Sequence, residues 1–140
     1  MPLMFAYGSN MDVAAIAGRC PRSKPLGVAR LMRHRLAAMR EGWLTVARDA
    51  RATVHGVLWE VALADVAALD RYEGVGGGLY VKSLQAVVAA GGARRALVYL
   101  GANAGPGQLR PDYAAAVIAA ARHWGLPAES LAALAALARR

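Results

Sequence analysis

The sequence predicts an α+β domain in which a mixed, mostly antiparallel sheet curls into a small barrel and is flanked by helices. Segments rich in β-branched and apolar residues gather between residues 26 and 102, whereas helical patterns occupy both ends and one stretch in the middle. The element order is strand, helix, several strands, helix, hairpin and two helices, which fits a doubly wound parallel fold badly. The 140 residues, 57% of them hydrophobic, are enough for one core, so residues 1–140 are expected to form a single domain.

The chain opens with an apolar segment, Pro2–Tyr7, that is predicted to be a short buried strand. It runs into Gly8-Ser9-Asn10, whose residue types suit a tight turn, since Gly8 and Asn10 tolerate a left-handed backbone. A helix is predicted over Asp12–Gly18, capped by a side-chain oxygen of the turn or of Asp12. Unpaired amides and the positive end of the helix dipole meet at this turn, which favours an anion or oxyanion site. A plain strand, turn and capped helix explains the same residues without a ligand.

The next segment is predicted to supply much of the sheet. Two prolines make Cys20–Pro25 a surface connection, and Leu26–Met39 is predicted to be two strands or one bent strand with a solvated face or edge. A short strand is expected over Trp43–Ala47. Asp49–Ala52 is predicted to turn the chain, and the apolar, β-branched segment Thr53–Val61 is predicted to be a central strand.

A second helix is predicted in the middle of the chain. Asp65 is expected to cap it, and apolar residues follow at helical spacing as far as Tyr72 or Glu73. The helix is expected to end at Gly74, and the glycines at 76–78 predict a mobile loop after it.

The last third of the sequence predicts a hairpin and two helices. Leu79–Ala90 and Ala93–Ala102 are expected to pair around a two-glycine turn. Pro111 is typical of a helix start, and the helix that follows has one apolar face and is ended by Gly125-Leu126-Pro127. A final helix is predicted over Ala128–Leu137.

Charge and composition restrict the partners that we expect. The formal net charge of +8 invites a nucleic-acid interpretation, but the basic residues are scattered and no RNA- or DNA-binding signature accompanies them, so no nucleic-acid partner is predicted. No apolar run is long enough to cross a bilayer and no signal-peptide pattern occurs, so we expect no membrane association and a cytoplasmic location. The single cysteine, Cys20, excludes an internal disulfide framework and fits a reducing compartment.

Motifs for common cofactors and metals are missing from the sequence. Gly74–Leu79 fails the dinucleotide fingerprint at its last position, no phosphate-binding loop occurs, and His34, His55 and His123 lack metal-ligand spacing. No metal and no cofactor are therefore predicted. A thiol nucleophile would pair Cys20 with His34 or His55, but a lone cysteine before a proline is more typical of a packing residue.

Two polar residues remain as candidates for chemistry. Ser9 lacks the G-x-S-x-G setting of a nucleophile, so its hydroxyl is interpreted as a capping or substrate-binding group. Glu73 lies where a helix gives way to a glycine-rich loop, so apolar surroundings can raise its pKa while the loop leaves it reachable. A solvated carboxylate at a helix end is the plainer explanation, and Glu60 is the next candidate for a base.

Several short motifs follow one another along nearly the whole chain: Tyr7-Gly8-Ser9-Asn10, Gly27–Leu31, His55–Glu60, Leu69–Val75, Tyr80, and Tyr113 with Gly125-Leu126-Pro127. In their order and rough spacing they resemble the γ-glutamylcyclotransferase-like superfamily. The resemblance implies the α+β barrel of that family. It also implies its reaction, in which a γ-glutamyl amide cyclises to 5-oxoproline and releases an amine or amino acid.

The same resemblance assigns roles to individual positions. The glutamate of the family pattern L-D-x-x-E-G-V is a general base, and this position is Glu73. The substrate-binding positions that it implies are Phe5, Ala6, Tyr7, Gly8, Ser9, Asn10, Tyr80 and Tyr113. The implied partner is a small γ-glutamyl substrate, which the sequence does not narrow to one leaving amine. An inactive binding or interaction protein on the same scaffold is the alternative, and the sequence is compatible with a homodimer.

Overall fold

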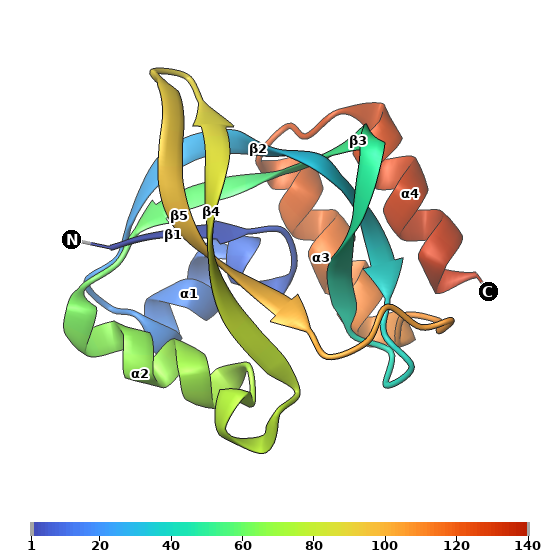
Figure 1. Ribbon diagram of the computed structural model, residues 1–140, viewed down its shortest axis with the longest axis horizontal. Coiled ribbons are helices and arrows are strands. Elements are labelled where there is room, and N and C mark those ends of the chain that lie inside the picture. Colours follow the sequence, from blue (N-terminus) through green and yellow to red (C-terminus); the bar gives the residue numbers. More distant parts are fainter. Residues whose placement is uncertain (1, 140) are drawn as a thin grey trace.

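Five strands close into a barrel in the structure, a computed structural model that describes residues 2–139 (Figure 1). The order around the barrel is β1-β3-β2-β4-β5, and neighbouring strands are antiparallel except β1 and β5, which are parallel. The strands are β1 (Leu3–Ala6), β2 (Lys24–Ala38), β3 (Leu44–Glu60), β4 (Tyr80–Ala89) and β5 (Gly92–Gly101). This arrangement confirms the predicted α+β class and the mostly antiparallel barrel.

The longest strands, β2 and β3, form one bent hairpin that crosses the molecule (Figure 1). At Arg33, whose φ is 60°, the pairing register shifts and residues 49–52 of β3 oppose this one residue. The predicted turn at Asp49–Ala52 is therefore wrong. The Arg51 N–H does donate to the Asp49 side chain, at 3.1 Å, as in a turn, but it does so inside a bulge that bends β3 without ending it.

The helices are α1 (Val13–Arg19), α2 (Leu63–Tyr72), α3 (Pro111–His123) and α4 (Ala128–Ala138). Figure 1 shows α3 and α4 paired on one side of the barrel, with α2 on the other side. Asp12 caps α1, because its Oδ1 accepts a hydrogen bond from the Ala15 N–H at 3.0 Å. None of the helices in the part of the chain that the structure describes has the length and apolar character needed to cross a membrane.

The predicted cap of α2 is wrong. The helix starts two residues before Asp65, after Ala62, and no side chain caps it. Asp65 instead lies buried in the first turn, where its Oδ1 is 3.1 Å from a guanidinium nitrogen of Arg22. The carboxylate still lies near the positive end of the helix, but the short connection between α1 and β2 supplies its partner.

The turn that follows β1 is held between β3 and α3. The Trp124 ring, just after α3, packs edge-on against Trp59 of β3 with centroids 6.0 Å apart. Its indole N–H donates to the carbonyl of Met11 at 2.8 Å. Inside the barrel Gly56 lets β1 approach β3, since a Cβ atom at this position would lie 2.3 Å from the carbonyl oxygen of Ala6. Contacts from two sides therefore fix the start of the turn and its end.

Candidate active site

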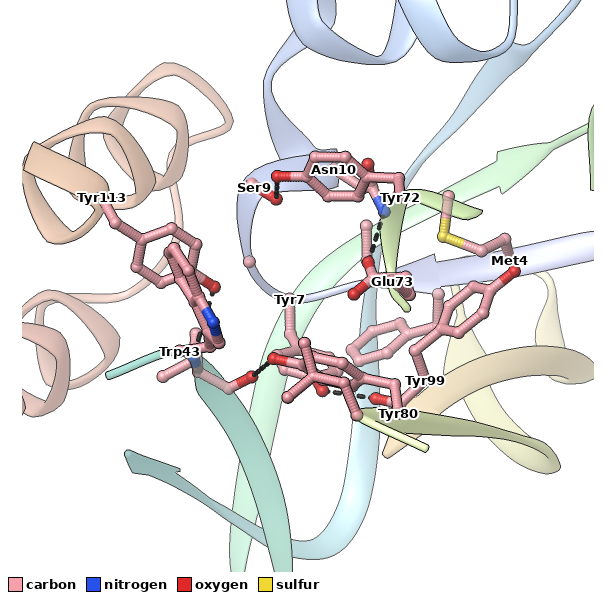
Figure 2. A pocket seen from close by; sticks show the side chains of 15 residues that line it. Met4, Tyr7, Ser9, Asn10, Trp43, Tyr72, Glu73, Tyr80, Tyr99 and Tyr113 are labelled. Atoms are coloured by element: carbon pink, nitrogen blue, oxygen red, sulfur yellow. Dashed lines mark hydrogen bonds between the residues drawn. The ribbon is translucent and has the colours of Figure 1, made fainter. Parts of the chain in front are cut away.

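A cavity of about 180 Å³ opens at the end of β1, next to the turn that follows this strand (Figure 2). One water needs roughly a tenth of this volume, so the cavity is large enough for a small organic ligand. It is lined by residues 4–10, Trp43, Leu44, Tyr72, Glu73, Leu79, Tyr80, Tyr99 and Tyr113. These residues come from four strands, two helix ends and the connections between them, so the cavity exists only in the folded barrel.

The turn Gly8-Ser9-Asn10 forms one wall of the cavity. Ser9–Met11 is a short 3-10 helix, and neither Gly8 nor Asn10 has a positive φ, so the turn does not use the left-handed backbone that both residue types tolerate. The glycine has a different use. A Cβ atom at Gly8 would lie 3.1 Å from the hydroxyl oxygen of Tyr113, so the missing side chain lets this hydroxyl approach the turn.

Backbone N–H groups of the turn remain available to a ligand. The N–H groups of Met11 and Asp12 donate to the carbonyls of Gly8 and Ser9, at 3.0 and 3.2 Å. Within residues 2–139 no backbone acceptor is found for the N–H groups of Gly8, Ser9 and Asn10. Gly8 and Ser9 are partly exposed, Asn10 is buried, and all three line the cavity, so the turn offers hydrogen-bond donors to anionic oxygen atoms there.

Glu73 reaches the cavity from the end of α2 (Figure 2). The helix stops here because Gly74 adopts φ 65°, a left-handed conformation that glycine adopts without strain. The carbonyl of Gly74 then accepts hydrogen bonds from the N–H groups of Gly77 and Leu79, both at 3.1 Å, and this closes a tight loop. One carboxylate oxygen, Oε1, accepts a 3.0 Å hydrogen bond from the Asn10 side-chain amide, so the carboxylate is fixed against the turn.

Burial raises the pKa of Glu73 from its ordinary value to about 7. The Arg19 charge and the Asn10 hydrogen bond act in the opposite direction, since both favour the carboxylate. Near neutral pH the group is therefore divided between its protonated and ionised forms. A carboxylate with such a pKa can accept a proton from a substrate and return it later.

Five tyrosines line the cavity beside Glu73, and the hydroxyl groups of three of them donate to a backbone carbonyl or a carboxylate. Tyr7 donates to the carbonyl of Tyr99, Tyr80 to the carbonyl of Leu44, and the Tyr99 hydroxyl to the Asp70 carboxylate at 2.8 Å. The hydroxyl oxygen of Tyr113 accepts a hydrogen bond from the Leu44 N–H at 3.3 Å. Its own proton therefore remains available to a ligand.

The structure brings all the site residues predicted from the sequence to this one cavity: Phe5, Ala6, Tyr7, Gly8, Ser9, Asn10, Glu73, Tyr80 and Tyr113. Their roles toward a substrate stay predictions. Sequence reasoning did not place Trp43, Tyr72 or Tyr99 in the site. The Trp43 and Tyr113 rings pack edge-on with centroids 5.1 Å apart, and Figure 2 shows this pair across the cavity from Glu73.

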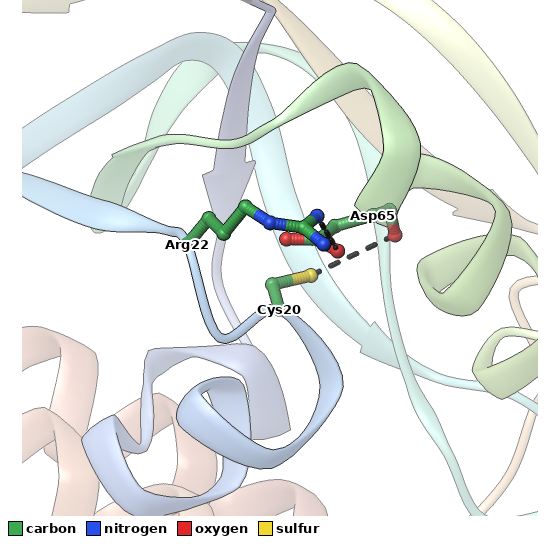
Figure 3. A network of polar contacts seen from close by, with 3 residues as sticks. All are labelled: Cys20, Arg22 and Asp65. Atoms are coloured by element: carbon green, nitrogen blue, oxygen red, sulfur yellow. Dashed lines mark hydrogen bonds and ion pairs between the residues drawn. The ribbon is translucent and has the colours of Figure 1, made fainter.

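The thiol of Cys20 lies elsewhere (Figure 3). Its side chain is fully buried and approaches the carbonyl of Asp65 at 3.8 Å. Burial raises the pKa of this thiol to about 11, with the Asp65 charge acting in the same direction. His34 contacts the Met32 carbonyl and His55 contacts Ser130, so neither ring activates the thiol. In the described residues no three His, Cys, Asp or Glu side chains are grouped as metal ligands.

A sequence model described as "Gamma-glutamyl cyclotransferase, AIG2-like" matches residues 4–124 of this chain. The chain belongs to this family. A mouse γ-glutamylcyclotransferase is 30% identical over 138 residues, which cover 91% of this chain and 73% of the mouse protein. This result confirms the resemblance seen in the sequence.

Solved structures also match the barrel and its helices. One γ-glutamyl cyclotransferase has a TM-score of 0.88 at 29% identity, over 96% of this chain and 86% of its own. An uncharacterized human protein has a TM-score of 0.86 at 30% identity, again over 96% of this chain and 86% of its own. The family match covers every residue that lines the cavity, including Glu73.

Proposed function

We propose that this protein is a γ-glutamyl cyclotransferase that releases 5-oxoproline and an amine or amino acid from a γ-glutamyl amide, with Glu73 as the general base. The observation that carries the proposal is the placement of the Glu73 carboxylate in a cavity that it shares with the donors of the Gly8-Ser9-Asn10 turn. Membership of the cyclotransferase family supports the same reaction.

In the proposed reaction the substrate supplies both nucleophile and electrophile. Glu73 takes a proton from the α-ammonium group, and the freed amine attacks the γ-carbonyl carbon of the same molecule. The bond from that carbon to the leaving nitrogen then breaks, and Glu73 returns the proton to the departing amine. Atoms balance without water, because the substrate divides into 5-oxoproline and an amine. Ring closure within one molecule exploits a high effective molarity, so the protein has only to fold the substrate and move a proton.

The groups around Glu73 suit the charges of such a substrate. None of the described residues that line the cavity is Lys or Arg, so the carboxylate of Glu73 is the group that attracts the α-ammonium. The α-carboxylate and the developing oxyanion are negative, and the turn amides and the Tyr113 hydroxyl are the neutral donors that can bind them. Trp43 lines the far side of the cavity and is assigned to the leaving amine.

A product assay with a blocked substrate tests the proposal. The protein is incubated with a panel of γ-glutamyl amino acids, γ-glutamylamines and glutathione, and products are identified by mass. We expect 5-oxoproline from at least one member and no product from its N-acetyl form, because acetylation removes the nucleophile and leaves the γ-amide intact. Free glutamate instead of 5-oxoproline would mean hydrolysis at the turn, and binding without turnover would favour an interaction protein on this scaffold.

A further inference from the structure

Arg19 is the last residue of α1, is partly buried, and is not among the residues that line the cavity. Its guanidinium nevertheless contacts two neighbours of the candidate base. A guanidinium nitrogen donates to Asn10 Oδ1 at 2.6 Å, and the guanidinium carbon lies 3.4 Å from the centre of the Tyr72 ring. Asn10 in turn donates to Glu73 at 3.0 Å. A continuous set of contacts therefore joins the end of α1 to the carboxylate.

The chemistry of the three groups fixes the orientation of the Asn10 amide. A guanidinium can only donate hydrogen bonds, and a carboxylate can only accept them. The carbonyl oxygen of Asn10 must therefore face Arg19, and its NH₂ group must face Glu73, as the structure has them. Without Arg19, no charged partner would hold the oxygen, and the buried amide would be free to rotate away from the carboxylate.

The second contact fixes the residue that precedes Glu73 in the chain. The Tyr72 ring lies under the Arg19 guanidinium, a cation–π arrangement, and its hydroxyl is 2.8 Å from the Ser9 hydroxyl. Tyr72 is 44% exposed, so packing against the core does little to hold it. The guanidinium and Ser9 are the contacts that keep this ring at the rim of the cavity.

We propose that Arg19 is a positioning residue for Glu73, acting through the side-chain amide of Asn10 and the ring of Tyr72. Its part in catalysis rests on the proposed function, whereas its part in orienting the carboxylate does not. Arg19 itself touches no substrate in this proposal. It fixes the direction of the Asn10 donor and, as a nearby positive charge, favours the ionised form of the base.

Apart from Arg19 and the Asp70 carboxylate, which accepts the Tyr99 hydrogen bond, the titratable groups around Glu73 line the cavity with it. They are tyrosines from each neighbouring element: Tyr7 after β1, Tyr72 in α2, Tyr80 in β4, Tyr99 in β5 and Tyr113 in α3. Burial raises the pKa of Tyr7, Tyr80, Tyr99 and Tyr113 above the ordinary value. Removing Arg19 therefore leaves burial opposed only by the Asn10 hydrogen bond, and the pKa of Glu73 should rise.

The first test is a pH profile of kcat/KM for Arg19→Gln, with Arg71→Ala as the matched control. Arg71 is exposed in the last turn of α2, so its loss removes a positive charge close to Glu73 in sequence without touching Asn10. For Arg19→Gln we expect the basic form of the enzyme to appear at higher pH, with kcat/KM about tenfold lower or more near pH 6. The control should keep the original profile, and Arg19→Lys should recover part of the shift because it keeps the charge.

A double-mutant cycle decides whether Arg19 acts through Asn10. In the Asn10→Ala background, Arg19→Gln should cost much less kcat than in the natural protein, since the amide that it orients is missing. Additive losses would overturn the route through Asn10. A folded Arg19→Gln variant with an unchanged pH profile and rate would overturn the proposal as a whole. Thermal unfolding of each variant identifies losses that come from misfolding.

A measurement without substrate separates this inference from the proposed function. The NMR chemical shift of the Glu73 side-chain carboxyl carbon, followed against pH, reports the titration of this group directly. Arg19→Gln should move the midpoint upward and Arg71→Ala should not. If no γ-glutamyl substrate is turned over but the midpoint moves, the proposed function fails and the positioning role stands. If turnover is found but the midpoint and rate do not respond to Arg19→Gln, the positioning role fails alone.

Discussion

The side-chain amide of Asn10 donates a 3.0 Å hydrogen bond to the carboxylate of Glu73, a residue 63 positions further along the chain. One partner lies in the turn after β1 and the other at the end of α2. The bond therefore fixes the distance between the candidate base and the free N–H groups of the turn. Proton transfer and charge stabilisation at one small ligand both depend on such a fixed geometry.

Replacing Glu73 by Gln should abolish most of the activity and leave the fold intact. Gln keeps the size of the side chain and an oxygen that can accept the Asn10 hydrogen bond, but it cannot take a proton. We expect kcat to fall by roughly two to four orders of magnitude, the range for a positioned base. Steady-state assays of 5-oxoproline release, with circular dichroism of the variant, check this. A folded variant with near-normal turnover would mean that another residue is the base, and Glu60 would be tested next.

The rate should rise with pH as Glu73 loses its proton. Because burial raises the pKa of this carboxyl to about 7, log kcat/KM should increase with unit slope below this pH and level off above it. The substrate α-ammonium titrates at higher pH, so its effect on the profile can be distinguished from the titration of Glu73. A profile already level at pH 5 would show that the base is an ordinary solvated carboxylate.

The free energy of unfolding should also depend on the ionisation of Glu73. It should fall as pH rises over the range in which the rate increases. A carboxyl whose pKa is higher in the folded state binds its proton more tightly there, so it lowers stability as pH rises from about 4.5 to about 7 and has no further effect above that. The Glu73→Gln variant lacks this penalty and should exceed the natural protein in free energy of unfolding by up to about 3 kcal/mol near pH 8. The difference should shrink near pH 4, and denaturant unfolding at both pH values measures it.

Local sequence signals were sufficient to predict much of the fold and to single out Glu73 as the candidate base. The strand before Gly8, the helix capped by Asp12 and the hairpin from β4 to β5 depend on residue types close together in the chain. Glu73 was identifiable because a helix end beside glycines is a local pattern, and the family motif marks the same position.

The errors and omissions come from contacts between distant segments. Asp49–Ala52 has the residue types of a turn, but pairing with β2 keeps the segment in a strand. Asp65 has the chemistry of a cap but is paired with Arg22, a residue 43 positions away. Trp43 and Tyr99 line the cavity only because the barrel closes, and no residue spacing in the sequence predicts that they do.

Cys20→Ala should retain full activity. The thiol is fully buried, its hydrogen-bond contact within residues 2–139 is the Asp65 carbonyl, and its pKa is raised to about 11 (Figure 3). Removing one buried heavy atom should lower the free energy of unfolding by about 1 kcal/mol, as for a single methyl group. Assays of kcat alongside thermal unfolding separate the two effects. Loss of turnover at unchanged stability would revive the thiol mechanism.

Gly8→Ala should impair substrate binding through Tyr113. The added Cβ atom would lie 3.1 Å from the Tyr113 hydroxyl oxygen, so the ring must shift by a few tenths of an ångström and carry its donor away from the turn. We expect kcat/KM to fall by roughly ten- to a hundredfold, in keeping with small misplacements in active sites. Gly76→Ala is the matched control, because nothing lies within 4 Å of a Cβ atom at that position and its φ is not positive.

The double variant Gly8→Ala with Tyr113→Phe decides whether the hydroxyl carries this effect. Removing the hydroxyl relieves the close contact but also removes a proposed donor, so Tyr113→Phe alone should lower kcat/KM. The two losses should then be strongly non-additive: once the hydroxyl is gone, Gly8→Ala should cost little more. Additive losses would mean that the extra methyl group disturbs the turn itself, and the space beside Gly8 would have no link to Tyr113. Because both residues line the same cavity, this cycle measures how closely the turn and α3 cooperate in holding the substrate.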